Sequence, residues 1–302
     1  MNRFAELSAR LIPWTDTPDL DMQVLLAHVL DKPRAWVLAH PEATLTHKQE
    51  RALEKTLRQL ESGVPLPYVL EKKEFYGLEF EVTPEVLIPR PETELLVKRA
   101  ISWLRLTLSH GDAARKRQAK DSKSVKADSG MLRAVDVGTG CGCIAIALAV
   151  NLPELRVVAT DISPEAIDVA KRNARKFCMS NRIEFHCCDL FPTAGTFDFR
   201  LSTFNMIVAN LPYIPTETLH GLRVYGREPT IALDGGADGL RVIRRLLVEA
   251  TRRLTPGGLI LLEIEASQGA KVLSLAHDAF AEAEIHLHRD LSGHDRLLEI
   301  QV

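Results

Sequence analysis

The sequence of 302 residues lacks a strong charge imbalance, a long apolar run and an abundance of aromatic residues. Its 38 Lys and Arg nearly balance its 40 Asp and Glu, so the net charge of −2 gives no general attraction to nucleic acid or to an anionic membrane. The longest apolar run, residues 143–150, is too short to cross a bilayer. The first residues, MNRFAELSARLIPW, have no apolar stretch typical of a signal peptide, so we expect a cytoplasmic protein without a membrane partner.

Cysteine is also scarce, with five residues in the whole chain. The odd number, and their positions inside expected core elements, argue against a disulfide framework. Cys141 and Cys143 are separated by one residue and no second pair matches them, so they do not form the pattern of a zinc site. We therefore expect small buried thiols and no metal site.

The length accommodates one α/β catalytic domain and a smaller second domain. Residues 1–73 are expected to form a helical domain, because Asp21–Leu30 and Thr46–Leu60 carry apolar residues at intervals of three and four. In residues 74–90 the pattern changes to alternating apolar and polar residues, with Gly77 at a bend. This alternation predicts a β-hairpin that links the two domains.

Residues 91–302 are expected to form the catalytic domain, which begins with a helix over about Glu92–Leu104. Residues 105–130 then break every periodicity, and their polar, basic composition predicts a flexible surface insertion. A nucleic-acid-binding arm is the alternative for this segment, but the basic stretch contains no aromatic side chain that would stack on bases.

Apolar strands and helical segments alternate after Met131, which predicts a mostly parallel sheet with helices on both faces. The expected strands are residues 134–138, 156–161, 183–190, 204–210 and 259–264. Residues 284–302 instead predict two strands joined by a short turn. A parallel sheet of seven strands that ends in such a hairpin resembles the class I S-adenosylmethionine-dependent methyltransferase fold.

The sharpest local signal is a glycine-rich turn between the first expected strand and an apolar helix, with Gly138, Gly140 and Gly142. Such a turn brings backbone close to a ligand and aims the amides of a helix N-terminus at it. The spacing G-x-G-x-G differs from the G-x-G-x-x-G of dinucleotide sites. In addition, the Asp136 carboxylate would repel a pyrophosphate but suits the ammonium group of a methionine. The turn therefore favours S-adenosylmethionine over NAD.

Acidic residues end the next two expected strands. Asp161 lies about twenty residues beyond the turn, where ribose hydroxyls are held in such folds, and Ser163 follows as a helix cap. Asp189 ends the third strand, where its carboxylate suits an adenine amino group and Leu190 or Phe191 suits the ring. Because ligands bind at the carboxyl ends of parallel strands, these residues are expected to surround one cofactor.

The fourth expected strand ends in Asn210-Leu211-Pro212-Tyr213. Pro212 restrains Leu211 to extended geometry, which would aim the Leu211 carbonyl into the site. An amide or exocyclic ring nitrogen attacks poorly because its lone pair is delocalised. Asn210 and the Leu211 carbonyl can each accept one N–H of such a nitrogen, and Tyr213 can pack on its flat face. The sequence thus predicts methyl transfer to a planar nitrogen, with no metal and no protein nucleophile.

The chain resembles the release factor glutamine methyltransferases, the PrmC/HemK family. Asn210–Tyr213 is similar to the N-P-P-Y motif of amide and adenine methyltransferases. Further resembling segments are Leu26–Leu30, Ala39–Glu42, Glu74–Gly77, Val86–Glu94, Glu228–Pro229 and Ala232–Leu240. The resemblance runs through nearly the whole chain apart from the expected insertion.

The resemblance implies site residues position by position. The cofactor loop falls on Gly138, Thr139, Gly140, Cys141 and Gly142. The ribose-binding acid falls on Asp161, the adenine-side contacts on Asp189 and Leu190, and the substrate motif on Asn210–Tyr213. The implied reaction is N5-methylation of the glutamine in the Gly-Gly-Gln motif of peptide-chain release factors, with the small helical domain helping to dock that partner.

Two departures from the family pattern keep alternatives open. Leu211 replaces the first proline, giving N-L-P-Y, which resembles the motif of ribosomal RNA adenine dimethylases, and Glu265 stands where glycine is more frequent. The alternatives are a ribosomal-protein glutamine methyltransferase, an RNA or DNA adenine methyltransferase, and a cofactor-binding adaptor without turnover. Aromatic residues make up only 6% of the chain, which disfavours a base-flipping enzyme, and Asn210 and Tyr213 disfavour the adaptor.

Overall fold

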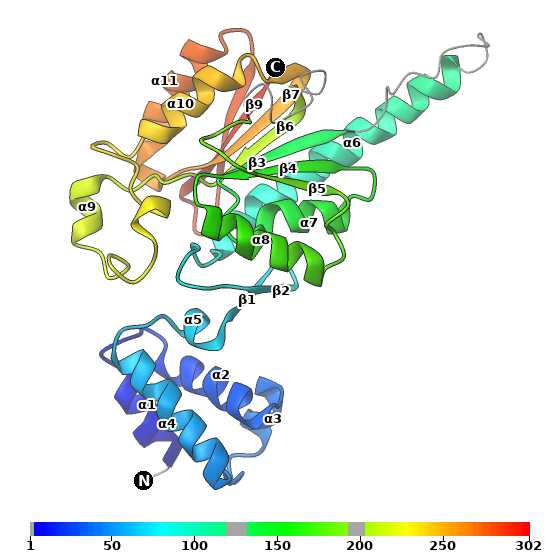
Figure 1. Cartoon of the computed structure of the whole chain (residues 1–302). Coiled ribbons are helices and arrows are strands. Elements are labelled where there is room, and N and C mark those ends of the chain that lie inside the picture. Colours follow the sequence, from blue (N-terminus) through cyan, green and yellow to red (C-terminus); the bar gives the residue numbers. More distant parts are fainter. Residues whose placement is uncertain (1–2, 119–131, 193–202) are drawn as a thin grey trace. The chain divides into compact units, whose positions relative to one another are not determined.

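The computed structural model describes residues 3–118, 132–192 and 203–302. The chain forms two compact units (Figure 1). One unit comprises residues 1–73 and 82–84, and the other comprises residues 74–81 and 85–302. Among the described residues, no helix has the length and apolar character needed to cross a membrane, and no group of three His, Cys, Asp or Glu side chains could hold a metal ion.

The smaller unit is built from helices, as the periodicity predicts. They are α1 (Arg3–Leu11), α2 (Pro18–Leu30), α3 (Arg34–Ala39), α4 (His47–Glu61) and α5 (Leu66–Leu70). Thr46 and Gln49 form a reciprocal capping box that begins α4. The core of this unit includes Leu11, Met22, Leu25, Leu53 and Leu57. The two helices expected over Asp21–Leu30 and Thr46–Leu60 are confirmed.

A β-hairpin follows, formed by β1 (Lys72–Phe75) and β2 (Leu78–Glu81). Tyr76 and Gly77 both have positive φ, at 53° and 73°, which is the two-residue turn that suits the twist of a hairpin. The Asn173 side chain binds the backbone of Glu81 in both directions, at 2.8 and 2.9 Å, and also donates to the Cys141 carbonyl at 2.9 Å. The end of the hairpin is thereby tied to the glycine-rich turn.

The larger unit contains a seven-stranded sheet in the order β5-β4-β3-β6-β7-β9-β8. Its strands are β3 (Arg133–Val137), β4 (Arg156–Asp161), β5 (Ile183–Cys187), β6 (Phe204–Ala209), β7 (Leu254–Glu263), β8 (Glu284–Arg289) and β9 (Asp295–Gln301). The first five are parallel, whereas β9 pairs antiparallel with both β7 and β8. The predicted class I methyltransferase fold, including the terminal hairpin, is confirmed.

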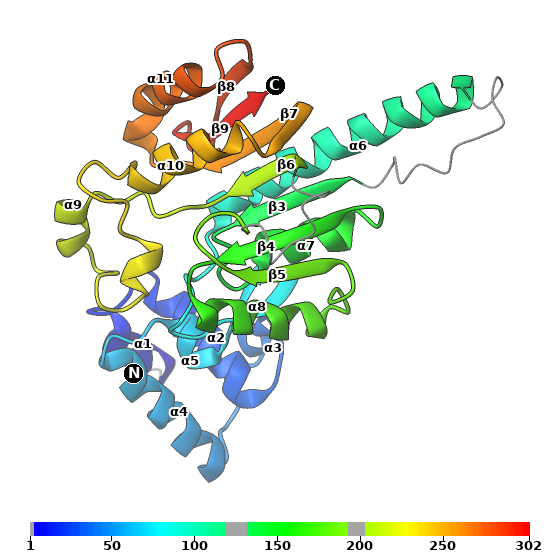
Figure 2. The same cartoon turned by 45° about the horizontal axis from the view of Figure 1, so that its top comes forward.

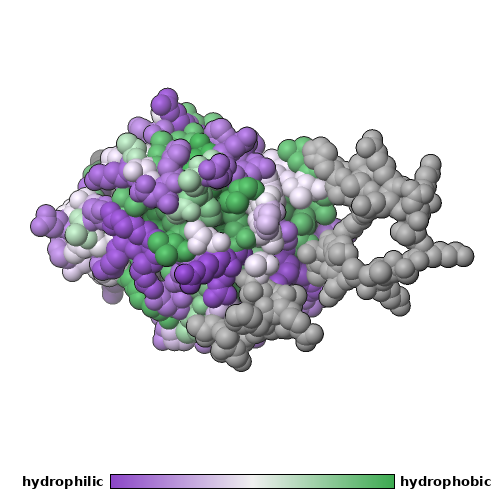
Figure 3. All heavy atoms as spheres, turned by 90° about the horizontal axis from the view of Figure 1, so that it is seen from above, coloured by the Kyte–Doolittle hydropathy of each residue, from purple (hydrophilic) through white to green (hydrophobic). Residues whose placement is uncertain are grey.

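Helices cover both faces of this sheet (Figures 1 and 2). The helices α6 (Glu94–Gln118), α7 (Cys143–Asn151) and α8 (Pro164–Lys176) lie on one face, and α10 (Arg241–Ala250) and α11 (Gly269–Ala279) lie on the other. Every residue of α7 from Cys143 to Ala149 is buried, which explains its uninterrupted apolar sequence. On the face seen in Figure 3, hydrophobic residues gather between surrounding hydrophilic ones.

Three sequence expectations need correction in this unit. Only Cys141 and Cys143 are the buried thiols that were expected, because Cys178 and Cys187 are exposed. The helix expected to end near Leu104 continues to Gln118, so residues 105–118 of the expected insertion are helical. Apolar periodicity cannot reveal a polar helix, but the Ala, Arg, Lys and Gln residues of this stretch have high helix propensity. Residues 119–130, the rest of the expected insertion, lie outside the described residues. The strand expected over residues 183–190 ends at Cys187, because its only neighbouring strand among the described residues, β4, ends at the paired residue Asp161.

Candidate functional site

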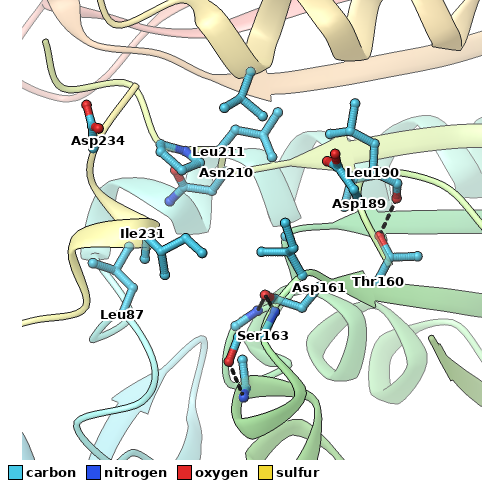
Figure 4. A pocket seen from close by; sticks show the side chains of 18 of the residues that line it. Leu87, Thr160, Asp161, Ser163, Asp189, Leu190, Asn210, Leu211, Ile231 and Asp234 are labelled. Carbon is cyan, nitrogen blue, oxygen red and sulfur yellow. Dashed lines mark hydrogen bonds between the residues drawn. The ribbon is translucent and has the colours of Figure 1, made fainter. Parts of the chain in front are cut away.

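A cavity of about 440 Å³ opens at the carboxyl ends of β3, β4 and β6, inside the larger unit. In Figure 4, Asn210 and Leu211 lie on one side of it, Asp189 and Leu190 on another, and Asp161 below. The predicted site residues that line it are Gly138, Gly140, Asp161, Asp189, Leu190, Asn210, Leu211 and Pro212. The others, Asp136, Thr139, Cys141, Gly142 and Tyr213, are not among the lining residues. The volume suits a ligand of cofactor size.

The glycine-rich turn connects β3 to α7. Its three glycines have φ values of 74°, 55° and 84°, which a residue with a Cβ adopts only under strain. The amides of Gly138 and Thr139 both donate to the Thr160 carbonyl, at 2.9 and 2.8 Å. A Cβ on Gly138 would lie 3.2 Å from the Leu211 side chain, whereas one on Gly140 would meet nothing within 4 Å. The turn therefore leaves an unobstructed backbone approach at Gly140.

Asp136 is fully buried beneath this turn. Its Oδ2 accepts from the Thr139 hydroxyl at 2.6 Å and from the Ala145 amide at 3.1 Å, which joins β3, the turn and α7. Its Oδ1 has no hydrogen-bond partner among the described residues. Burial raises the pKa of Asp136 to about 7 in spite of these two bonds. The Oδ2 thus stabilises the turn. The Oδ1 can still accept a hydrogen bond, and the described residues supply no donor for it.

Asp161 ends β4 and lines the cavity, as predicted. Its Oδ2 accepts from the Gly140 amide at 2.9 Å, and its Oδ1 accepts from the Ser163 amide at 3.0 Å. Burial nevertheless raises the pKa of Asp161. Ser163 caps α8 as expected, because its hydroxyl accepts from the Ala166 amide at 3.0 Å. The carboxylate is held in place by backbone donors, and it faces the cavity.

The third acidic position sits on a tight turn after β5. Leu190 has a φ of 61°, and the Phe191 amide donates to the Asp189 carbonyl at 3.0 Å, so the chain reverses over three residues. The Thr160 hydroxyl fixes this turn by donating to the Leu190 carbonyl at 2.7 Å. The Asp189 carboxylate pairs with Arg245 of α10 at 2.6 Å. Sequence reasoning missed Arg245, because the pair joins residues 56 positions apart.

Asn210 and Leu211 end β6 at the cavity. The Asn210 Nδ2 donates to the Thr93 hydroxyl at 3.1 Å. Among the described residues, no donor is bound to the Asn210 Oδ1 or to the Leu211 carbonyl, so both acceptors are unengaged. The Leu211 side chain is buried in the core that includes Val137 and Leu240. The Leu211 side chain, which departs from the family motif, therefore anchors the loop in the core. The Leu211 backbone carbonyl remains available as a hydrogen-bond acceptor.

Tyr213 is not among the residues that line the cavity. Its hydroxyl donates to the Glu263 Oε1 at 3.3 Å, and its ring packs against the core of the larger unit. Burial is the main cause that raises the pKa of its hydroxyl. Sequence reasoning assigned no role to Thr93 or Glu263. Thr93 lies in the family segment Val86–Glu94, and Glu263 lies near the end of an expected strand.

Two family models match the chain. Residues 4–70 match the PrmC N-terminal domain, and residues 128–287 match a methyltransferase domain. The release factor glutamine methyltransferase of Coxiella burnetii is 36% identical, and the match covers 97% of this chain and 95% of that protein. The chain belongs to the release factor glutamine methyltransferase family. The family member from Moorella thermoacetica is 38% identical, over 93% of this chain and 90% of that protein.

Solved structures agree with this family at the level of the fold. The catalytic domain of human Mettl16, in complex with a 3′UTR hairpin, has a TM-score of 0.51 and 14% identity, and the match covers 83% of this chain and 81% of that chain. At this identity the likeness concerns the methyltransferase fold alone.

Gly239, in the family segment Ala232–Leu240, lies close to the backbone of Tyr213 in the substrate motif. A Cβ on Gly239 would overlap the Tyr213 carbonyl oxygen, so the close approach of these two backbones requires glycine. The Gln268 Nε2 donates to the same carbonyl at 2.8 Å. Gly239 and Gln268, which lie outside the motif, thus help to fix the loop after Pro212.

Glu265, the second departure from the family pattern, has a clear structural role. Its φ of −77° and ψ of 143° are ordinary for a side-chain-bearing residue. Its carboxylate accepts from the Ser267 amide at 2.8 Å, and its own amide donates to the Gln268 Oε1 at 3.1 Å. Glu265 therefore holds Gln268 in the position from which that side chain reaches Tyr213.

Proposed function

We propose that this chain transfers the methyl group of S-adenosylmethionine to the side-chain amide nitrogen, N5, of the glutamine in the Gly-Gly-Gln motif of a peptide-chain release factor. Membership of the release factor glutamine methyltransferase family supports this reaction. The observation that carries it is the pair of unengaged acceptors, the Asn210 Oδ1 and the Leu211 carbonyl, at the edge of the cavity. A primary amide offers two N–H donors to such a pair.

The cavity residues fit the proposed cofactor. The open backbone at Gly140 suits the methionine end. Asp136 is fully buried beneath the turn and would support this end by holding the turn in place. Asp161 suits the ribose hydroxyls, and Asp189 with Leu190 suits adenine. When bound, the cofactor supplies the activated methyl group, so no protein nucleophile or metal is needed.

The substrate motif would prepare the amide nitrogen for attack. With one N–H bound to the Asn210 Oδ1 and the other to the Leu211 carbonyl, the amide plane is fixed and its nitrogen is directed toward the methyl donor. Both acceptors also stabilise the positive charge that develops as the nitrogen loses planarity. Tyr213 would fix the loop through its bond to Glu263 and would pack its ring on the flat face of the amide.

The smaller unit has a proposed role in substrate docking. We assign residues 1–73 to contact with the protein partner, residues 74–90 to the linker and residues 91–302 to catalysis. The match of residues 4–70 to the PrmC N-terminal domain supports a dedicated role for the helical part. Because the proposed partner acts in translation, the reaction would take place in the cytoplasm.

The test is mass spectrometry of a purified release factor after incubation with this protein and S-adenosylmethionine. A ribosomal protein and a ribosomal RNA fragment run in parallel, and a factor whose Gly-Gly-Gln glutamine is replaced by alanine is the control. We expect one added methyl group on the intact motif and none on the control. Methylated RNA beside an unmodified factor would instead mean that Leu211 marks an adenine methyltransferase, and the proposal would be withdrawn.

A further inference from the structure

The ion pair between Asp189 and Arg245 is formed by two side chains that both line the cavity. Asp189 lies on the tight turn after β5, and Arg245 lies on α10, which covers one face of the sheet. The Arg245 Nη2 donates to the Asp189 Oδ2 at 2.6 Å. Arg245 is thus a cavity residue that contacts an expected cofactor ligand, although no motif pointed to it.

The backbone of the turn is fixed by contacts that do not reach the Asp189 carboxylate. The Phe191 amide donates to the Asp189 carbonyl at 3.0 Å, and the Thr160 hydroxyl donates to the Leu190 carbonyl at 2.7 Å. The Asp189 Oδ1 accepts from no donor among the described residues. Within the part of the chain that the structure describes, Arg245 is therefore the donor that restrains the direction of this carboxylate.

The direction of the carboxylate matters for which purine the cavity accepts. An ionised carboxylate only accepts hydrogen bonds, and the exocyclic amino group of adenine donates them. Hypoxanthine carries a carbonyl oxygen at the same ring position, and this oxygen would be repelled by the carboxylate. A carboxylate held in place should therefore bind adenine more tightly, and hypoxanthine less tightly, than one that is free to rotate away.

We propose that Arg245 is a positioning residue that holds the Asp189 carboxylate toward the purine and thereby increases the preference of the cavity for adenine. Arg245 acts through Asp189, because its Nη2 engages the Oδ2 and leaves the Oδ1 for the amino group of the base. The proposal rests on the proposed function for the identity of the cofactor, but it is independent of the molecule that receives the methyl group.

The expected effect is modest because the pair is accessible to water. The side chains of Asp189 and Arg245 are 48% and 49% exposed. Ion pairs of this kind change an equilibrium constant by up to about fivefold, whereas a hydrogen bond from the base to the charged carboxylate contributes about tenfold or more. Loss of Arg245 should therefore reduce the preference for adenine without abolishing it.

Arg244 offers a matched control on the same helix. It pairs with Asp238, and the two side chains are 44% and 38% exposed. Neither residue is among those that line the cavity. Arg245→Met and Arg244→Met each remove one cation and one exposed ion pair, and both keep an unbranched apolar side chain. An effect of net charge or of helix stability should appear in both variants, whereas an effect through Asp189 should appear only in Arg245→Met.

The test is calorimetric titration of the full chain with S-adenosylhomocysteine and with its hypoxanthine analogue S-inosylhomocysteine, without any release factor. Competition titration serves for the weaker ligand. The native protein should prefer the adenine ligand by about tenfold or more. In Arg245→Met this preference should fall by about twofold to fivefold, with weaker binding of S-adenosylhomocysteine and no weaker binding of S-inosylhomocysteine. Arg244→Met should keep both native affinities.

A second pair of variants tests whether Arg245 acts through Asp189. In an Asp189→Ala background the further change Arg245→Met should leave the affinities for both ligands unaltered, because the carboxylate that Arg245 holds is already absent. An additional loss in this background, or weaker binding of S-inosylhomocysteine by Arg245→Met alone, would mean that Arg245 contacts the base itself, and would overturn the positioning role.

An unchanged preference in Arg245→Met, or the same fall in Arg244→Met, would also overturn it. These outcomes do not involve the methyl acceptor, and Asp189 lies on a different side of the cavity from Asn210 (Figure 4). The expected preferences in a protein that leaves release factors unmodified would therefore support this proposal and count against the proposed substrate alone. A native protein that binds neither ligand would overturn the cofactor assignment and this proposal together.

Discussion

At the scale of single residues, the site separates groups that face the cavity from groups that hold them. The Asn210 amide joins both sets, because its nitrogen binds Thr93 while its oxygen remains unengaged among the described residues. Asp136 belongs to the supporting set, since its Oδ2 ties the glycine-rich turn to α7. Substitutions of groups that face the cavity should therefore lower turnover, whereas substitutions of supporting groups should change stability.

Asn210→Ala should abolish most methyl transfer and leave cofactor binding intact. The alanine removes one of the two acceptors that orient the amide, a loss that typically lowers kcat by about 10²–10³. Calorimetric titration with S-adenosylhomocysteine and single-turnover kinetics would separate the two properties. Normal turnover by this variant would eliminate the role given to Asn210.

Asp136→Asn should change how stability depends on pH. Because the pKa of Asp136 is raised to about 7 in the folded chain and lies near 3.9 in an unfolded one, the folded state binds the extra proton between these values. The contribution of this group is thus fully present below about pH 4 and is lost as the pH rises through about 7.

The stability of Asp136→Asn relative to the native protein should accordingly increase by roughly 1.4 kcal/mol for each pH unit across that window. Urea unfolding at several pH values measures the difference. A constant difference from pH 4 to 7 would show that Asp136 is not buried in its neutral form at the acidic end.

At the scale of elements, the strands and most helices follow from periodicity, whereas the contacts between elements do not. The alternation after Met131 predicts the sheet because buried parallel strands need continuous apolar segments. The last turns of α6 escaped prediction because residues 109–118 carry no apolar stripe. Thr93 and Glu263 escaped because they meet Asn210 and Tyr213 only after folding, across 117 and 50 residues.

The loop that carries the motif depends on a close backbone approach, which Gly239→Ala would disturb. The added Cβ would overlap the Tyr213 carbonyl oxygen and displace the loop. Gly293→Ala is the matched control, because Gly293 has a similar positive φ, at 83° against 77°, and open space around its Cβ position.

Both alanine variants should lose about 1–2 kcal/mol from backbone strain. Only Gly239→Ala should also lose kcat, by about tenfold or more, because a displacement of about 1 Å costs catalysis heavily. Thermal unfolding and steady-state kinetics of the two variants provide the comparison. Equal catalytic losses would mean that strain alone, and not the contact with Tyr213, explains the glycine.

At the scale of the whole molecule, the chain combines a cavity of cofactor size in one compact unit with a separate helical unit. If the helical unit docks the protein partner, the complete release factor should be a much better substrate than a short peptide with the Gly-Gly-Gln motif. We expect kcat/KM to fall by about 10² or more for the peptide, since remote contacts supply binding energy. Similar values for both substrates would remove the docking role from residues 1–73.

The central claim concerns one atom, the side-chain nitrogen of one glutamine. Tandem mass spectrometry of the methylated release factor tests it most directly, together with acid hydrolysis of the isolated peptide. The account predicts that fragment ions place the methyl group on the glutamine of Gly-Gly-Gln, and that hydrolysis of its side-chain amide releases methylamine. A methyl group on any other residue, or a glutamine that releases only ammonia, would contradict it.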